Sequence, residues 1–199
     1  MKSIKLLMAM SLLLSITSCY AKIGNVRLPE FNSFINVGSP QLVYQEMSSL
    51  IDKSSEVSQL KALLDNYFEL KDALVKTDGN TASLKAEALL KAINSINKES
   101  LAKNEYDEWI KVMKELAFDA EHISETKDAG HQRDHFISLS KNMYSIAKVT
   151  KQEEPVYYQF CPMANKGKGA NWLSKESSVK NPYYGAKMLG CGKTVETIK

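Results

Sequence analysis

Apolar residues that recur at helical spacing constrain the fold more than any other feature of the chain. The first stripe occupies positions i, i+3, i+4, i+7, i+10 and i+14 and consists of Leu60, Leu63, Leu64, Tyr67, Leu70 and Leu74. The three stripes that follow are Ala86, Leu89, Leu90, Ile93 and Ile96; Tyr106, Trp109, Ile110, Met113, Leu116, Ala117, Ala120 and Ile123; and Phe136, Leu139, Met143, Ile146 and Ala147. Four amphipathic helices joined by short connections pack best as an antiparallel bundle. We therefore predict a mainly α fold with the aromatic and methionine side chains of the stripes in its core.

Capping and turn residues separate these stripes. Ser39-Pro40 supplies a helix cap and a proline at the first helical position, which predicts a short helix from there to about Lys53. The cluster Thr77-Asp78-Gly79-Asn80 ends the first long helix, and Thr81 is predicted to cap the next one. Asp128-Ala129-Gly130 breaks the chain before the last stripe.

The composition changes after Pro155. Residues 156–160 (VYYQF) favour an extended segment, and five glycines with two prolines then make residues 155–199 loop-rich. A segment this short with so few aliphatic residues does not form a stable unit by itself. It is predicted to pack on the bundle through Trp172, Leu173, Tyr183 and Tyr184. Residues 39–199 are therefore predicted to be a single domain, with the bundle at 39–150 and this C-terminal tail packed on it.

The first residues have the pattern of an export signal. MKSIK carries two lysines, and the apolar run LLMAMSLLLSITS that follows is too short to span a bilayer comfortably. Ile16-Thr17-Ser18-Cys19 has the form of a lipobox, so residues 1–19 are predicted to be a signal peptide and Cys19 the lipid attachment site. Ordinary cleavage after Ala21 is the alternative. Residues 20–38 would then be a spacer, and we expect a lipid-anchored periplasmic protein of the bacterial cell envelope.

Charge and motifs argue against nucleic acid as a partner and against an enzyme. The formal net charge of +3 falls to about +1 once Lys2 and Lys5 leave with the signal peptide, whereas nucleic-acid-binding domains are usually strongly basic. The chain has no G-x-S-x-G motif, no glycine-rich phosphate loop after a strand and no candidate serine triad. Lys166-Gly167-Lys168-Gly169 has the character of a flexible, solvated turn. No enzymatic activity is predicted.

Two segments of the tail place cysteine beside methionine, as Cys161-Pro162-Met163 and as Met188-Leu189-Gly190-Cys191. A pair of cysteines in an exported domain is normally bridged. A disulfide between Cys161 and Cys191 would stabilise the fold by about 3–4 kcal/mol in the chain-entropy model. In this interpretation the two methionines fill gaps in the packing.

The alternative interpretation uses all four sulfur atoms as metal ligands. An extended Cys-x-Met triplet sends both side chains to one face, and Met-x-x-Cys does the same on a helical turn. Thiolate and thioether are soft donors that select monovalent copper or silver over calcium and magnesium. The ligands would be Cys161, Met163, Met188 and Cys191. The chain has no Cys-x-x-Cys pair, so neither a zinc ribbon nor a thioredoxin-type site is supported.

The histidines offer a weaker metal site. His131 and His135 stand at i and i+4 on the last predicted helix, a spacing that can chelate a metal, but no His-Glu-x-x-His context surrounds them. The other interpretation gives them capping or surface roles. His122 is expected to point away from the apolar stripe of its helix, towards solvent. Arg133 is expected to ion-pair with, or donate hydrogen bonds to, the packed tail.

The tail sequence C-P-M-A … G-A-N-W-L-S … N-P-Y-Y-G-A-K-M-L-G-C-G resembles a family of exported bacterial domains of undetermined function, also found fused to periplasmic adaptor subunits of copper/silver-type heavy-metal efflux pumps. The resemblance extends upstream through residues 67–74 and 131–140 and covers roughly residues 58–199. It implies an envelope protein linked to metal handling, with a pump adaptor or another envelope protein as partner. Its sulfur positions here are Cys161, Met163, Met188 and Cys191.

The same triplet resembles the C-P-M-H start of small heavy-metal-binding modules, but Ala164 replaces the histidine and supplies no imidazole. Two functions follow as expectations. The first is an envelope protein that binds Cu(I) or Ag(I) and acts as a carrier, a sensor or an accessory to efflux. The second is a disulfide-stapled interaction module without metal, which would dock on an envelope partner through an exposed tail rich in tryptophan and tyrosine.

Overall fold

The computed structural model describes residues 58–199. The predicted signal peptide, the lipid attachment at Cys19, the spacer at 20–38 and the short helix from Ser39 to Lys53 lie outside the described residues. Within residues 58–199, no helix combines the length and the apolar character that crossing a bilayer requires.

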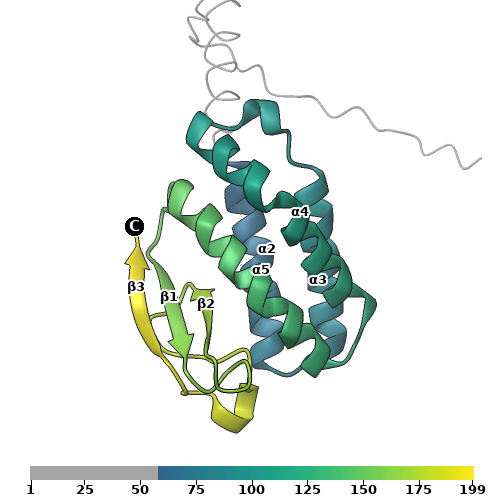
Figure 1. The fold of residues 1–199 in the computed structure, drawn as a ribbon, viewed down its shortest axis with the longest axis vertical. Coiled ribbons are helices and arrows are strands. Elements are labelled where there is room, and N and C mark those ends of the chain that lie inside the picture. Colours follow the sequence, from purple (N-terminus) through teal and green to yellow (C-terminus); the bar gives the residue numbers. More distant parts are fainter. Residues whose placement is uncertain (1–57) are drawn as a thin grey trace, which may run out of the picture.

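Four helices form an antiparallel bundle, as the apolar stripes predicted (Figure 1). They are α2 (Gln59–Val75), α3 (Gly79–Asn94), α4 (Lys103–Glu125) and α5 (Ala129–Val149), and a short 3₁₀ helix, η1 (Lys98–Ser100), precedes α4. Each helix packs against the next in sequence, and α5 closes the arrangement by packing against α2. The mainly α fold is confirmed.

The buried faces of the helices follow the predicted stripes with one departure. On α4 the buried side chains are Trp109, Val112, Leu116, Asp119, Ala120 and Ile123. Tyr106 and Ile110, which were predicted to be core residues, are exposed. The buried stripe of α4 runs through positions 109, 112, 116 and 120, and Tyr106 and Ile110 lie on its flank.

The cap of α3 also differs from the prediction. The helix begins at Gly79, so Asp78 and not Thr81 is its N-cap residue. The Thr81 backbone N–H donates to Asp78 Oδ1 at 3.0 Å, and the Thr81 hydroxyl donates to Asp78 Oδ2 at 2.6 Å. The Asp78 carboxylate takes the capping position because it precedes the first turn and its oxygens reach the free N–H groups there.

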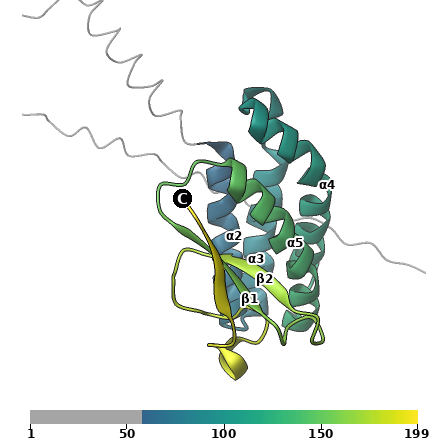
Figure 2. The same cartoon turned by 60° about the vertical axis from the view of Figure 1, so that its left-hand side comes forward.

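The tail forms a small antiparallel sheet of three strands in the order β2-β1-β3. The strands are β1 (Val156–Cys161), β2 (Ala170–Ser174) and β3 (Lys193–Ile198), and a short 3₁₀ helix, η2 (Gly185–Met188), lies between β2 and β3. The extended segment predicted at 156–160 is β1. Figure 2 shows the sheet lying along one side of the bundle, where β2 packs on α5.

The tail is anchored by the aromatic residues that the sequence singled out. Trp172 and Leu173 are fully buried, Tyr183 is buried, and Tyr184 is half-buried. The Tyr67 ring stacks on Phe136 at a centroid distance of 5.3 Å, and its hydroxyl accepts a hydrogen bond from the Leu173 backbone N–H at 3.0 Å. Bundle and sheet therefore share one hydrophobic core.

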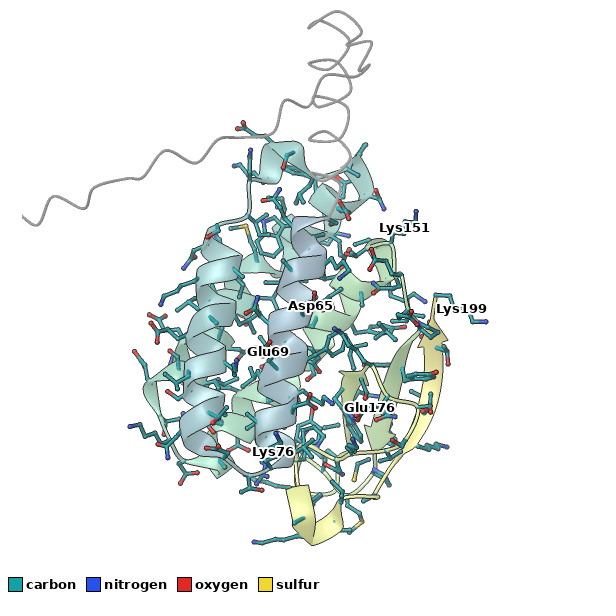
Figure 3. All side chains as sticks on the ribbon, turned by 180° about the vertical axis from the view of Figure 1, so that it is seen from behind. Asp65, Glu69, Lys76, Lys151, Glu176 and Lys199 are labelled. Atoms are coloured by element: carbon teal, nitrogen blue, oxygen red, sulfur yellow. The ribbon has the colours of Figure 1, made fainter. Side chains whose placement is uncertain are left out.

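The two ends of the tail lie together, because Val156 pairs with Ile198, whereas its middle part, η2, lies at one end of the bundle (Figure 3). The segment η2 packs against the C-terminal end of α2, close to Lys76. Lys151 and Lys199 both lie well away from Lys76 along the bundle. The first cysteine of the tail, Cys161, is the last residue of β1.

Candidate metal centres

The pairing of β1 with β3 brings the two cysteines of the tail together. Phe160 lies opposite Lys193 in the antiparallel register, so Cys161 at the end of β1 faces the residues that precede β3. The sulfur atoms of Cys161 and Cys191 lie 2.7 Å apart. Cys161 is fully buried and Cys191 is half-buried. Two of the four sulfur residues singled out in the sequence therefore meet in space.

The loop that carries Cys191 is fixed by a buried amide and a glycine. The fully buried Asn181 donates from Nδ2 to the Cys191 carbonyl oxygen at 2.8 Å, and its Oδ1 accepts from the Tyr183 backbone N–H at 2.8 Å. Gly192 has a φ of +140°, and a Cβ there would lie 2.8 Å from the carbonyl oxygen of Phe160. Only glycine allows the chain to pass this close to β1 immediately after Cys191.

The two methionines stand beside the cysteines in the chain and are open to solvent. The Met163 and Met188 side chains are 53% and 38% exposed. The Cys191 backbone N–H donates to the Met188 carbonyl oxygen at 3.0 Å, and the Tyr184 hydroxyl donates to the Met163 carbonyl oxygen at 2.6 Å. Neither thioether is committed to the core, so both are free to reorient.

The Cys191 thiol is not an activated nucleophile. The hydrogen bond with the Cys161 thiol raises the pKa of Cys191, burial raises it further, and the Met163 backbone N–H lowers it only in part. A reactive cysteine needs a lowered pKa, so the Cys191 thiol stays protonated at neutral pH. A metal ion that binds here must displace protons, which makes binding dependent on pH.

The histidines gather where α4 meets α5. His131 and His135 stand one turn apart on α5, as predicted, and His122 joins them from α4. His122 was expected to face solvent alone. It is half-buried instead, with its ring centroid 4.7 Å from that of His135. The signal in the sequence was present, because His122 and His131 lie at similar distances from the turn between two antiparallel helices.

Arg133 ties the bundle to the tail, as predicted. Its Nε donates to the Pro182 carbonyl oxygen at 2.7 Å, and its Nη2 donates to the Leu74 carbonyl oxygen at 2.9 Å and to the Thr77 hydroxyl at 2.8 Å. Burial lowers the pKa of Arg133. Because these hydrogen bonds join α5 to the end of α2 and to the tail, the guanidinium has a structural role.

Trp172 and Tyr183 contribute nothing to the expected tryptophan- and tyrosine-rich docking surface, whereas Tyr157, Tyr158 and Tyr184 are half-buried. Trp172 and Tyr183 are buried because they anchor the sheet to the bundle. The large apolar side chains that the tail does expose are Met163, Met188, Leu189 and Val195. Any partner that binds the tail would therefore meet methionine and aliphatic side chains.

Comparison with curated proteins and with solved structures gave no match. One family model matches residues 63–155, which include nearly all of α2, all of α3, α4 and α5, and the connection to β1. The sheet and both cysteines of the tail lie outside the matched range. The family whose model matches these residues is described as "Protein of unknown function (DUF3347)".

Proposed function

We propose that the protein binds a monovalent soft metal ion, copper or silver, at Cys161, Met163, Met188 and Cys191. The supporting observation is that the sulfurs of Cys161 and Cys191 lie 2.7 Å apart, and that Met163 and Met188, which are close to them in the chain, are exposed to solvent. In this proposal the protein works in the cell envelope as a carrier, a sensor or an accessory to metal efflux. A pump adaptor or another envelope protein is the partner.

The chemistry of the donor set suits this cargo. Thiolate and thioether sulfur are the ligands that Cu(I) and Ag(I) prefer, and the set contains no carboxylate that would favour a hard cation. Of the proposed ligands, Cys161 is buried and Cys191 is half-buried, whereas the Met163 and Met188 side chains are exposed. Neutral thioethers hold a cation less strongly than thiolates do, so this arrangement favours transfer of the metal over storage.

A specific observation favours the rival function, a disulfide-stapled interaction module without metal. Cys161 is fully buried and its sulfur is adjacent to that of Cys191, which suits a structural bridge in an oxidising compartment. In that case the exposed methionine and aliphatic side chains of the tail would form the docking surface.

Counting free thiols separates the two functions. Protein isolated from the envelope under non-reducing conditions is denatured and titrated with a thiol reagent. Two reactive thiols from the tail support the metal site. A complete bridge, together with no uptake of Cu(I) after mild reduction, refutes the metal site and leaves the interaction module.

Binding is then measured by competition for Cu(I) with a chromophoric chelator. We expect Met163→Leu or Met188→Leu to weaken binding at least tenfold, about 1.4 kcal/mol, because each removes one soft ligand at nearly constant volume. Leu189→Ala is the matched control, since it shortens an exposed side chain of the same loop that has no sulfur. Equal affinities for all three variants would show that the thioethers are not ligands.

A further inference from the structure

We propose a second metal site, formed by His122, His131 and His135, that binds one divalent ion of the zinc or copper(II) class. One nitrogen from each of the three rings can be chosen so that all three lie within 4.8 Å of one another. The chain contains three histidines in all, and every one of them belongs to this cluster. The site does not depend on the sulfur atoms of the tail.

The distances are close to those that a metal requires. Zinc–imidazole bonds are about 2.0–2.1 Å long, so the nitrogens of a tetrahedral site lie roughly 3.3 Å apart. Rotations of the side chains would have to shorten the present separations, which are at most 4.8 Å, to that value. The ring centroids of His131 and His135 are 5.0 Å apart, as expected for two residues one turn apart on a helix.

The backbone that carries the three histidines is fixed. Asp128 caps α5, and its Oδ1 accepts from the Gly130 and His131 backbone N–H groups at 2.7 and 2.9 Å. The fully buried Gln132 donates from Nε2 to the carbonyl oxygens of Ile123 and Thr126 at 3.3 and 2.8 Å. These bonds tie the last turns of α4 to the first turn of α5, so much of the ordering is complete before an ion arrives.

A buried carboxylate gives independent support for a cation. Asp119 Oδ1 lies 3.1 Å from Nδ1 of His135, and the Asp119 side chain is only 3% exposed. Its other oxygen, Oδ2, is buried with no hydrogen-bond partner among residues 58–199. Histidines that bind metals typically donate their second ring nitrogen to a carboxylate in this way. When His135 donates from Nδ1 to this carboxylate, the lone pair of its Nε2 is left for the ion.

A buried carboxylate with a single hydrogen-bond partner is costly, because burial removes its hydration without full compensation. A divalent ion on the far side of the His135 ring would offset that cost. This explains why the sequence places an acidic residue on the buried face of α4, among Leu116, Ala120 and Ile123.

The residues around the histidine cluster indicate which class of ion would bind and that a fourth coordination position would be accessible. The Phe118 ring, which is 50% exposed, lies 4.3 Å from the His122 ring and covers one side of the cluster. His131 is exposed, so a water molecule or a ligand from a partner can reach the ion there. Three imidazoles suit Zn²⁺, Cu²⁺ and Ni²⁺, and they differ from the soft sulfur donors of the tail.

The test is a titration of tag-free, EDTA-stripped protein with Zn²⁺ alone, followed by NMR of the histidine rings. We expect one equivalent to shift the signals of all three imidazoles together, and to raise the melting temperature of the wild type. His122→Ala and His131→Ala are each expected to raise the Kd at least tenfold. The Asp119 carboxylate positions His135 without touching the ion. Asp119→Asn should therefore raise the Kd about 10–100-fold with unchanged stoichiometry.

Two controls keep the result unambiguous. Glu121→Gln changes an exposed residue next to His122 and should leave the Kd unchanged. Cys161→Ser should also leave it unchanged, since the proposed ligands are nitrogen atoms. The proposal is overturned if zinc shifts fewer than three ring signals, if it does not bind at all, or if only the cysteine variant loses binding. Circular dichroism in EDTA confirms that each variant is folded.

Discussion

The hydroxyl of Tyr67 makes a sharp test of how the tail is held on the bundle. This oxygen lies at the junction of three elements: it accepts from the Leu173 backbone N–H of β2 at 3.0 Å and contacts the Ser140 hydroxyl of α5 at 2.9 Å. Tyr67 itself belongs to α2, and its ring and Ser140 are fully buried. The change Tyr67→Phe removes only the oxygen and keeps the ring stacked on Phe136.

The magnitude follows from the groups left behind. In Tyr67→Phe the buried Leu173 N–H, which points away from β1, loses its acceptor. An unsatisfied buried donor lowers the free energy of unfolding by about 1–3 kcal/mol. The Ser140 hydroxyl adds less, because a serine in a helix can turn to the carbonyl oxygen one turn earlier. For a domain of this size, we expect the melting temperature to fall by roughly 4–10 °C.

Thermal unfolding measures the loss, and amide hydrogen exchange locates it. Exchange should accelerate at Leu173 more than at the amides in the middle of α3. Tyr184→Phe is the matched control, because it deletes the same atom from a hydroxyl that bonds the exposed loop at Met163. A melting temperature of Tyr67→Phe within 1 °C of the wild type, or no change at Leu173, would refute this account of the junction.

Three further predictions concern the turns and the link between bundle and tail. Gly79→Ala should destabilise the fold by about 1–3 kcal/mol in chemical denaturation, because the new Cβ would lie 2.0 Å from the Lys127 carbonyl oxygen. Gly190→Ala is the control: its Cβ would meet nothing within 4 Å, so the change should be tolerated. The backbone N–H groups of α5 lower the pKa of Asp128, so its capping stabilisation is present above the unfolded pKa of about 4 and is lost as the pH falls through the lower folded value. Asp128→Asn keeps a cap that does not titrate, and its melting temperature should therefore drop less between pH 6 and pH 2. Arg133→Lys replaces a fork that serves three acceptors with a single ammonium, and should lower the free energy of unfolding by about 1–3 kcal/mol.

The helices could be predicted because local spacing determines their buried faces. The residues of the first stripe, from Leu60 to Leu74, are all buried in the structure. Strand β3 could not be predicted in the same way. Five of its six residues are exposed or half-buried, and only Ile198 is buried. The strand exists because it pairs with β1, and pairing between distant segments leaves little pattern in the sequence.

The candidate sites show the same limit. The cysteine pair could be anticipated because two residues of one rare type are the natural candidates for each other. Only part of the histidine cluster could be predicted. His131 and His135 are close in sequence at i and i+4, but His122 joins them through packing between helices. Asp119 was not singled out, because a carboxylate on a helix is normally solvated, and its burial becomes evident only when α5 covers it.

The two candidate sites differ in what holds them, and this difference bears on how each would exchange a metal. The histidines stand on two helices whose ends are tied by Gln132 and Asp128, so the backbone of the proposed nitrogen site is fixed before an ion arrives. The methionines stand on loops with exposed, adjustable side chains, so the sulfur site must order part of its ligand set upon binding. Ordering costs affinity but lets a partner's soft ligands replace the thioethers one at a time. A site with a fixed backbone for a borderline ion and an adaptable site for a soft ion can therefore work on one domain without competing for the same cation.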